Sequence, residues 1–400
     1  MTTTDTHDRR IDLDWLRIGA FALLILYHVG MFYVTWDWHV KSARASDAVE
    51  PLMQLVNPWR LSLLFLISGV ATRFIADKTT ATGLAVSRFD RLFWPLLFGM
   101  FVIVPPQSYY ELREAAAHVG GALSDPSSFT GDWWSFYFRY ATGYAGWCDA
   151  DGCLTVPTWN HLWFVAYVLV YTLVLAALWP LLRRSDLRWP AGAAGSVLFL
   201  VAPWLYLWAS RAALFPVFGS THALSDDWYN HAVYGGIFLL GFVMAKTPAP
   251  FDLAMRLRWA ALTLALVGYG VSQAFTLRWG DAEAPALELL VARGFRELQA
   301  WMAIVALLGF ARRHWNRDSP LRRYLTEAIF PFYILHQTAI VVIAYHLDKL
   351  SLPLTLEVAL VIAGTAAVCW GGFEVVRRIS VLRPMFGLKG SFRRQANAAR

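Results

Sequence analysis

The chain has 400 residues, of which 57% are apolar and only 16% are charged, and it contains 20 Trp. An ordinary soluble domain carries about 25% charged residues. The composition therefore excludes a disordered chain and argues against a water-soluble enzyme. The formal net charge of +7 is expected to reflect basic residues in cytoplasmic loops, so no nucleic-acid partner is predicted. The composition predicts an all-α integral membrane protein.

Apolar runs long enough to cross a membrane recur along the whole sequence. A helix needs about 20 apolar residues to cross ~30 Å of hydrocarbon. The sequence predicts about ten such helices in a single polytopic domain over residues 1–400, with Pro105 and Pro106 ending or bending the third. The predicted spans are residues 15–35, 59–76, 92–109, 159–182, 190–209, 229–246, 259–277, 291–311, 323–347 and 354–376.

The placement of basic residues predicts the orientation. Ten spans put both termini on one side, and most of the 35 Lys and Arg fall on that side. The positive-inside rule then places both termini in the cytoplasm. The polar N-terminus lacks a signal-peptide pattern, so the first span is expected to stay in the bilayer.

The longest loop, about residues 110–158, is rich in Trp, Tyr, Gly and Asp and is a candidate for short interfacial helices. Cys148 and Cys153 lie in this loop, on the side predicted to be outside. An oxidising compartment would let them pair, and two free thiols are the alternative that the sequence leaves open. Cys369 is predicted to be a small apolar residue in the last span. No CxxC pair or Cys/His cluster suggests a metal site.

Ionisable residues inside predicted spans are candidates for function, because their burial in lipid is costly. Arg17 and His28 are 11 residues apart on the first span, so they share a helix face and lie about 16 Å apart along the axis. His336 enters the ninth span to a depth close to that of His28. The two imidazoles are therefore predicted to share a cavity, beside the kink expected at Pro331. The alternatives are a snorkelling Arg17 and structural His residues that bond between helices.

Two further groups of arginines stand near predicted membrane boundaries. Arg60, Arg293 and Arg296 fall in the outer halves of their spans and can hold an anionic group. The alternative is an interfacial ion network with Glu297. Arg88 and Arg91, between the second and third spans, share a face if this segment is helical, and they can bind phosphates on the cytoplasmic side. The alternative is that they are ordinary positive-inside residues.

These motifs, taken together, resemble the membrane-bound acyltransferase-3 family, in particular its glucan biosynthesis protein C (glucan succinyltransferase) type. The resemblance covers most of the chain in the expected order. It rests on Arg17 with His28, LFLISG (Leu64 to Gly69), Arg88 with Arg91, NHLWFVAYVLVY (Asn160 to Tyr171) and YLTEAIFPFYILHQT (Tyr324 to Thr338).

The resemblance implies a transmembrane O-acyltransferase of a bacterial inner membrane. Such a protein moves an acyl group from cytoplasmic acyl-CoA, with succinyl-CoA favoured and acetyl possible, to hydroxyls of a periplasmic glucan. An imidazole supplies a general base with a pKa near neutrality. The expected partners are acyl-CoA, the glucan and membrane lipid. The resemblance implies a catalytic role for His28 and CoA binding for Arg17, Arg88 and Arg91. His336 is predicted as a second catalytic residue from its depth, and the predicted substrate-binding residues are Arg60, Arg293, Arg296, Glu297 and Trp163.

Other functions remain open at this point. One alternative is an O-acetyltransferase of another envelope glycan. A proton-coupled secondary transporter also uses intramembrane His, Arg and Glu, but no repeat relates His28 to His336. A non-catalytic sensor or scaffold leaves the similar depth of the two imidazoles unexplained. The acyl group, the acceptor, direct transfer against an acyl-enzyme, and the oligomeric state are not determined by the sequence.

Overall fold

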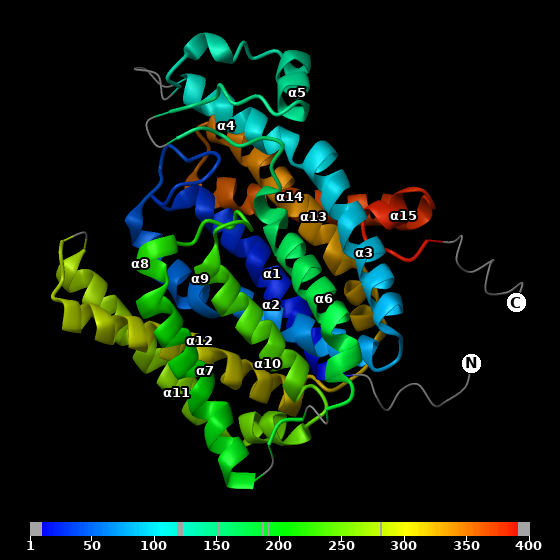
Figure 1. Ribbon diagram of the computed structural model, residues 1–400. Coiled ribbons are helices and arrows are strands. Elements are labelled where there is room, and N and C mark those ends of the chain that lie inside the picture. Colours follow the sequence, from blue (N-terminus) through cyan, green and yellow to red (C-terminus); the bar gives the residue numbers. More distant parts are fainter. Residues whose placement is uncertain are drawn as a thin grey trace, which may run out of the picture. The chain divides into compact units, whose positions relative to one another are not determined.

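The computed structural model describes residues 10–117, 123–149, 152–185, 188–190, 192–280 and 282–390 (Figure 1). Within these residues the regular structure is helical, apart from an isolated antiparallel bridge between Cys148 and Cys153. The prediction of an all-α protein is confirmed. Both chain ends, residues 1–9 and 391–400, lie outside the described residues, so the prediction that they are cytoplasmic stays a prediction.

The described elements follow one another along the chain with short connections, except between α4 and α6. The α-helices are α1 (Ile11–Tyr33), α2 (Glu50–Ala76), α3 (Ala81–Phe98), α4 (Pro105–Ala117), α5 (Trp133–Ala141), α6 (Trp163–Leu182), α7 (Gly192–Ala213), α8 (Phe215–Phe218), α9 (Trp228–Asn230), α10 (Gly236–Met244), α11 (Pro248–Trp279), α12 (Ala286–His314), α13 (Pro320–Asp348), α14 (Leu354–Arg378) and α15 (Leu382–Met385). The 3₁₀ turns are η1 (Asp47–Val49), η3 (Pro126–Ser128) and η4 (Asn160–Leu162), and the π-helical turns are η2 (Gly99–Ile103) and η5 (His231–Gly235).

Among the described residues, nine helical runs are long and apolar enough to cross a membrane. They correspond to nine of the ten predicted spans. The remaining predicted span, residues 229–246, is the consecutive run of α9, η5 and α10, in which the π-helical turn separates two short α-helices. This run is shorter than the ~20 residues that a typical span needs. The protein is an α-helical, multi-pass membrane protein.

The third span begins earlier than predicted. Helix α3 starts at Ala81, so the segment between the second and third predicted spans is helical, and Arg88 and Arg91 lie three residues apart on one face, as expected for a helix. Thr80 accepts a hydrogen bond through its side chain from the backbone N–H of Gly83, which helps to start the helix at this point.

The third span also ends later than predicted. Pro105 and Pro106 begin α4, and the helical run continues to Ala117. The π-helical turn η2 precedes them and closes with a hydrogen bond of 2.8 Å from the Val104 N–H to the Gly99 carbonyl. Proline is tolerated in the first turn of a helix because its missing N–H would have no partner there.

The chain divides into two compact units, each assembled from three separate segments. Unit 1 comprises Met1–Ala22, Pro51–Ser87 and Val170–Thr326, and unit 2 comprises Leu23–Glu50, Arg88–Leu169 and Glu327–Arg400. In unit 1, the fully buried Trp301 on α12 packs edge-to-face with Phe199 on α7 and donates a hydrogen bond of 3.0 Å to its carbonyl. In unit 2, Phe32 on α1 belongs to a buried cluster with Ile340 on α13 and Val361 on α14.

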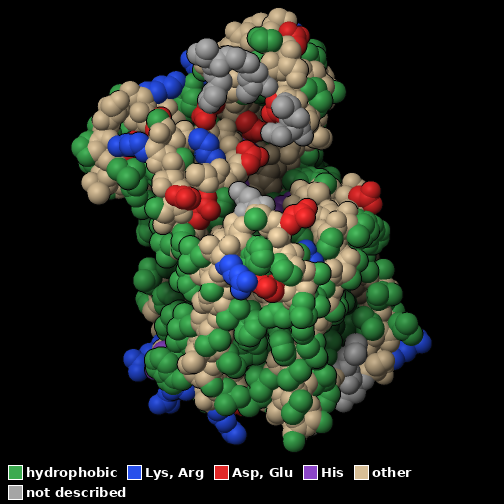
Figure 2. Space-filling model, turned by 90° about the vertical axis from the view of Figure 1, so that its left-hand side faces the viewer, with side chains coloured by type: hydrophobic (Ala, Val, Ile, Leu, Met, Phe, Trp, Pro, Cys, Tyr) green, Lys and Arg blue, Asp and Glu red, His purple; other side chains and the backbone are tan. Residues whose placement is uncertain are grey.

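Large apolar side chains cover much of the surface, as Figure 2 shows for one face. On α11 these include Trp259, Leu266 and Leu277, which are 63%, 52% and 87% exposed. Contiguous apolar surface of this extent is unusual for a protein in water but is expected where helices contact lipid.

Two glycines let α2 and α10 approach closely inside unit 1. A Cβ built on Gly69 would clash with the carbonyl oxygen of Phe238, and a Cβ built on Gly241 would clash with that of Leu66. Small residues at such crossings are a common means of packing helices in membranes. The crossing therefore explains the glycine of the LFLISG motif.

Gly69→Ala is expected to lower the free energy of unfolding by about 1–3 kcal/mol, because the added methyl meets backbone that cannot move aside. Thermal unfolding in detergent, followed by fluorescence size-exclusion chromatography, measures the effect. Gly270→Ala on α11 is the matched control, since a Cβ there meets no atom within 4 Å. Equal melting temperatures for the two variants would contradict the close crossing.

Candidate functional site

Two histidines from α1 and α13 meet directly within unit 2. His28 Nδ1 lies 2.7 Å from His336 Nε2, and the two ring planes are within 4° of parallel. His336 is fully buried, whereas His28 is half-buried. The structure thus brings into contact the two imidazoles that the sequence placed at similar depth.

The backbone around His336 determines which nitrogens of this pair carry protons. His336 Nδ1 lies 2.7 Å from the Tyr333 carbonyl oxygen, which can only accept, so Nδ1 carries the proton. In neutral His336, Nε2 is then an acceptor, and His28 must donate to it through Nδ1. In this tautomer His28 carries its lone pair on Nε2, which is the form that a general base requires.

A third imidazole lies against the pair. The ring of His161, at the start of the fourth span, is perpendicular to that of His336, with 5.1 Å between ring centres. Its Nε2 donates to the Ile334 carbonyl over 3.1 Å, and its own carbonyl accepts a hydrogen bond from the Tyr333 hydroxyl. His161 therefore connects the start of α6 to the turn of α13 that precedes His336.

Gln107 on α4 satisfies four neighbours at once. Its Oε1 accepts from Asn160 Nδ2 and from Gln337 Nε2, each over 3.0 Å. Its Nε2 donates to Thr338 Oγ1 over 2.7 Å and faces His161 Nδ1 at 3.3 Å. All four hydrogen-bonding positions of this buried amide are used, so it fixes α4, the start of α6 and α13 relative to one another.

The network continues into the loop that follows α1. Gln337 Nε2 donates to His39 Nε2 over 2.9 Å, and His39 Nδ1 lies 2.6 Å from Glu111 Oε2. Lys41 Nζ donates to the carbonyls of Met31 and Val34, at 2.8 and 3.0 Å, and so caps the end of α1. Burial lowers the pKa of Lys41. These contacts fix the helix end that carries His28.

The π-helical turn η2 exposes carbonyls that other elements use. Tyr137 and Tyr140 on α5 donate to the carbonyls of Phe101 and Met100, at 3.0 and 2.9 Å. Thr338 on α13 donates to that of Ile103 over 2.6 Å. Such turns occur often at functional sites, since they widen the helix and free backbone groups.

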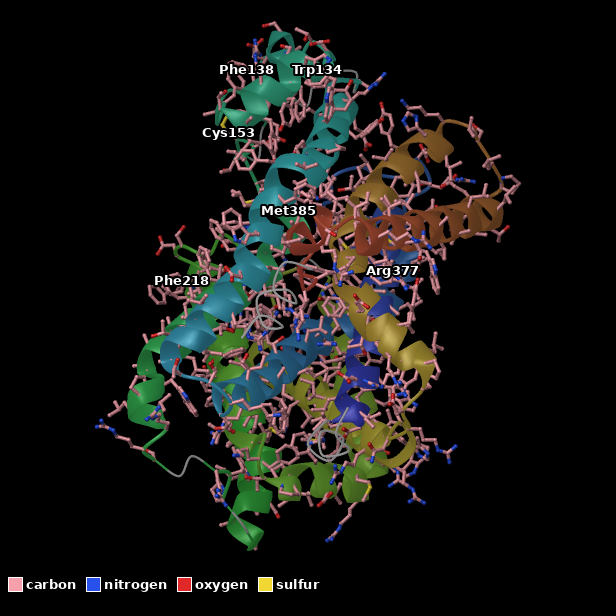
Figure 3. The ribbon with its side chains drawn as sticks, turned by 90° about the vertical axis from the view of Figure 1, so that its right-hand side faces the viewer. Trp134, Phe138, Cys153, Phe218, Arg377 and Met385 are labelled. Atoms are coloured by element: carbon pink, nitrogen blue, oxygen red, sulfur yellow. A yellow bond between two sulfur atoms is a disulfide. The ribbon has the colours of Figure 1, made fainter. Side chains whose placement is uncertain are left out.

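The segment between α4 and α6 carries the short helix expected in the long loop. On α5, Trp134 and Phe138 are 74% and 71% exposed and share a face (Figure 3). The structure answers the question of Cys148 and Cys153, because their sulfurs form a disulfide. Cys369 is a buried free thiol in α14, as predicted.

The predicted CoA-binding arginines lie in both units. Arg17 on α1 belongs to unit 1 and lies 3.7 Å from Asp14, which also pairs with Arg322. Arg88 and Arg91 fall in unit 2, where Arg88 is half-buried and Arg91 is exposed. That these residues bind CoA stays a prediction.

The predicted substrate-binding residues are divided in the same way. Arg60, Arg293, Arg296 and Glu297 belong to unit 1, where Glu297 and Arg60 are buried. Trp163 belongs to unit 2, begins α6 and packs edge-on against Tyr167, with 5.3 Å between ring centres.

Several polar residues of the histidine site were not predicted from the sequence. His161 and Asn160 lie within the NHLWFVAYVLVY motif, and Gln337 directly follows His336. Gln107 follows the Pro105-Pro106 pair, and His39 follows the first span. Each of these polar side chains lies next to a motif or span that the sequence had already indicated. Nothing in the sequence showed which of these side chains contact one another.

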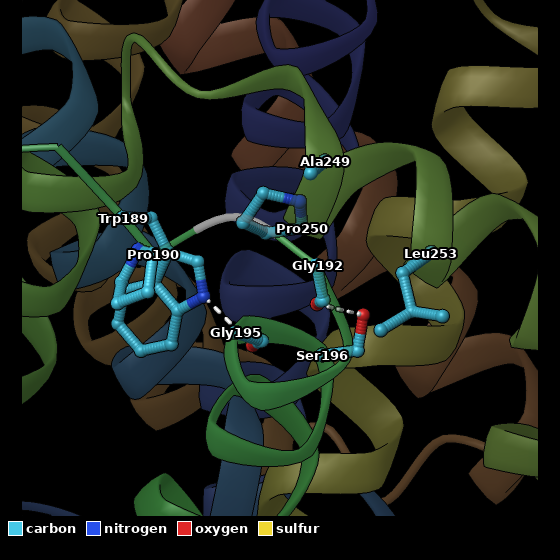
Figure 4. Close-up of a pocket in the computed structure, with 8 residues that line it drawn as sticks. All are labelled: Trp189, Pro190, Gly192, Gly195, Ser196, Ala249, Pro250 and Leu253. Atoms are coloured by element: carbon cyan, nitrogen blue, oxygen red, sulfur yellow. Dashed lines mark hydrogen bonds between the residues drawn. The ribbon is translucent and has the colours of Figure 1, made fainter.

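A small pocket at the N-terminal end of α7 carries no comparable chemistry (Figure 4). It lies within unit 1, and no ionisable side chain is among its lining residues. They are Trp189, Pro190, Gly192, Gly195, Ser196, Ala249, Pro250 and Leu253.

Comparison with known proteins identifies the class to which this site belongs. The profile of a family described as an acyltransferase domain (Acyl_transf_3) matches residues 10–374. The chain belongs to this family and is a multi-pass membrane acyltransferase, which confirms the resemblance drawn from the motifs.

Individual relatives are distant but match over almost their whole length. The chain is similar to the glucans biosynthesis protein C of Salmonella paratyphi B, of Salmonella dublin and of Salmonella typhi. Each is 23% identical over 407 residues, which cover 98% of this chain and 98% of the relative. No solved structure matches the chain.

Gln107→Leu is expected to destabilise the protein and to lower its activity, because it removes the acceptor of donors on the buried Gln337 and the half-buried Asn160. Each such group costs about 1–3 kcal/mol. Thermal unfolding in detergent tests this, with Ser108→Ala as the neighbouring control. The buried Ser108 hydroxyl has no hydrogen-bond partner among the described residues. If the two variants were equally stable, Gln107 would not hold the site together.

Proposed function

We propose that this membrane acyltransferase transfers an acyl group from an acyl-CoA thioester to a hydroxyl of a glycan, with His28 as the general base. The observation that supports this most directly is the 2.7 Å contact between His28 and His336, whose geometry makes His28 Nδ1 the donor and so puts the basic lone pair of His28 on Nε2. The family supplies the acyl-transfer class.

In the proposed reaction the glycan hydroxyl oxygen attacks the thioester carbonyl carbon, and its proton passes to His28 Nε2. The tetrahedral intermediate then breaks its carbon–sulfur bond, and the departing thiolate takes the proton from His28. The products are a glycan ester and free CoA. An acyl-His28 intermediate is the alternative route, and rapid quench of the reaction distinguishes the two.

His336 acts in this mechanism by positioning His28. Because its Nδ1–H is held by the Tyr333 carbonyl, its Nε2 presents a lone pair to the Nδ1–H of His28. This contact fixes the His28 tautomer and stabilises the imidazolium that forms during attack. A buried aspartate performs the same task for the histidine of a serine-protease triad.

The donor and acceptor are proposed from the resemblance and from the relatives. Arg17, Arg88 and Arg91 are proposed to bind the phosphates of CoA, since guanidinium groups pair well with phosphate. The relatives' name, glucans biosynthesis protein C, supports a glucan as acceptor. Succinyl-CoA as donor, a periplasmic acceptor and a bacterial inner-membrane location belong to the same proposal, with acetyl transfer as the alternative.

His28→Ala is expected to reduce acyl transfer by roughly 10²–10⁴-fold, because a general base contributes about this factor. Acyl-CoA affinity should stay near that of the wild type. His336→Leu should lower kcat less, and His336→Gln should restore part of the loss, since its amide oxygen can accept from His28. Radiolabelled transfer and acyl-CoA binding are measured separately, with His314→Ala, an exposed histidine at the end of α12, as control.

The outcome that would reverse these roles is near-normal transfer in His28→Ala together with an inactive His336→Leu. Normal transfer in both variants would overturn the proposed function.

The double replacement of Arg88 and Arg91 by Ala is expected to weaken acyl-CoA binding by at least ten-fold. Each charge-assisted hydrogen bond contributes about 1.5–3 kcal/mol. Isothermal titration with the CoA thioester measures this. Arg378→Ala is the control, because Arg378 is 70% exposed and pairs with Glu374. Unchanged affinity in the double variant would show that these two residues are ordinary boundary arginines.

A further inference from the structure

Three arginines and one carboxylate gather in unit 1, at the C-terminal end of α7 and near the start of α12. This arginine cluster consists of Arg211, Arg293 and Arg296 with Glu297. Arg211 Nη1 lies 3.7 Å from Glu297 Oε1, and Arg211 interacts electrostatically with both Arg293 and Arg296. The sequence placed three of these residues at one boundary but did not include Arg211.

Aromatic side chains surround the cluster. Arg211 donates to the Tyr229 hydroxyl over 2.9 Å, and its guanidinium lies 4.5 Å from the centre of the Phe215 ring. Tyr234 lies within electrostatic range of Arg296 and also of Arg60. Arg60 is 7% exposed and donates to Asn57 Oδ1 over 2.8 Å.

The charges in the cluster do not balance. Glu297 pairs with Arg211 and interacts electrostatically with Arg296, while Arg293 lies within electrostatic range of Arg211. Three guanidinium groups therefore share the cluster with one carboxylate. Buried charges are normally paired, because their desolvation is costly. The surplus of positive charge therefore calls for an anion.

Two hydrogen-bond donors in the cluster point to the same conclusion. The Nε atoms of Arg211 and Arg296 are buried and have no acceptor among the described residues. A guanidinium Nε–H buried without an acceptor is unfavourable, and a carboxylate or phosphate oxygen would satisfy it. A purely structural ion pair between Arg211 and Glu297 would not require the two further arginines.

We propose that the arginine cluster binds an oxyanion of the carboxylate or phosphate type. Planar guanidinium groups match such anions by paired N–H···O bonds. Two sources share this chemistry: a small soluble anion, including the free carboxylate of a dicarboxylic acyl group, and the phosphate of an anionic lipid headgroup. Glu297 holds Arg211 in place and competes with the anion for it.

The test uses the full chain reconstituted in phosphatidylcholine nanodiscs, with succinate and inorganic phosphate as probes in isothermal titration. The wild type is expected to bind at least one probe at a single site. Arg296→Gln should weaken that binding by at least ten-fold, and Arg296→Lys, which keeps the charge, should weaken it less. Glu297→Gln should strengthen it, because the competing carboxylate is removed.

Arg278→Gln is the matched control. Arg278 lies at the end of α11 in the same unit, is 67% exposed and pairs with Glu288. Its replacement should leave anion binding unchanged. Thermal unfolding of each variant in detergent establishes that it is folded.

The lipid source is distinguished by adding phosphatidylglycerol to the nanodiscs and by native mass spectrometry of retained lipid. If a headgroup occupies the cluster, phosphatidylglycerol abolishes binding of the free probes, and Arg296→Gln loses the retained lipid. If a soluble anion is the ligand, probe binding is the same in both membranes. Either result supports an oxyanion site.

Three results would overturn the proposal: neither probe nor phosphatidylglycerol binds, Arg296→Gln behaves like Arg278→Gln, or Glu297→Gln weakens binding. The proposal does not rest on acyl transfer. His28→Ala is expected to bind the anion as the wild type does, so loss of transfer with intact anion binding bears on the proposed function alone.

Discussion

Backbone groups in a membrane interior must find hydrogen-bond partners inside the protein, because lipid offers none. Where the backbone departs from a regular helix, side chains must therefore form the hydrogen bonds that the backbone groups lack. The π-helical turn η2 is completed by Tyr137, Tyr140 and Thr338, which donate to three of its carbonyls. The same requirement applies to α13, where two carbonyls accept hydrogen bonds from imidazole rings. His161 donates to the Ile334 carbonyl, and His336, on α13 itself, donates to the Tyr333 carbonyl. The histidine site is thus part of the hydrogen-bonding that lets these helices pack.

This requirement also gives the two central imidazoles different tasks. The Tyr333 carbonyl fixes the proton of His336 on Nδ1, and the buried ring can then only accept at Nε2. His28 is half-buried and, in the matching tautomer, carries its lone pair on Nε2. The burial and the tautomers of the two rings therefore agree with the proposed roles, in which His28 exchanges a proton with substrate and His336 holds His28 in place.

Intramembrane charges in this protein fall into two kinds. Glu357 is fully buried, yet it is satisfied by Arg44 and by the Tyr33 hydroxyl at 3.0 Å, so this group stabilises the fold. In the arginine cluster, by contrast, positive charge exceeds negative charge among the described residues. Buried charge without an equal countercharge is costly, and this cost is the reason for proposing an anion at the arginine cluster.

The sequence by itself determined the fold class, the approximate helices and the depth of Arg17, His28 and His336. Apolar length fixes a span, and helical pitch fixes depth and face, and both are local properties. The structure also decided that Cys148 pairs with Cys153, for which the sequence left both a disulfide and two free thiols open. Only the tertiary structure decided that His28 contacts His336 and that Gln107 joins three segments. Which face of one helix meets which face of another depends on contacts between distant segments, and no local pattern records them.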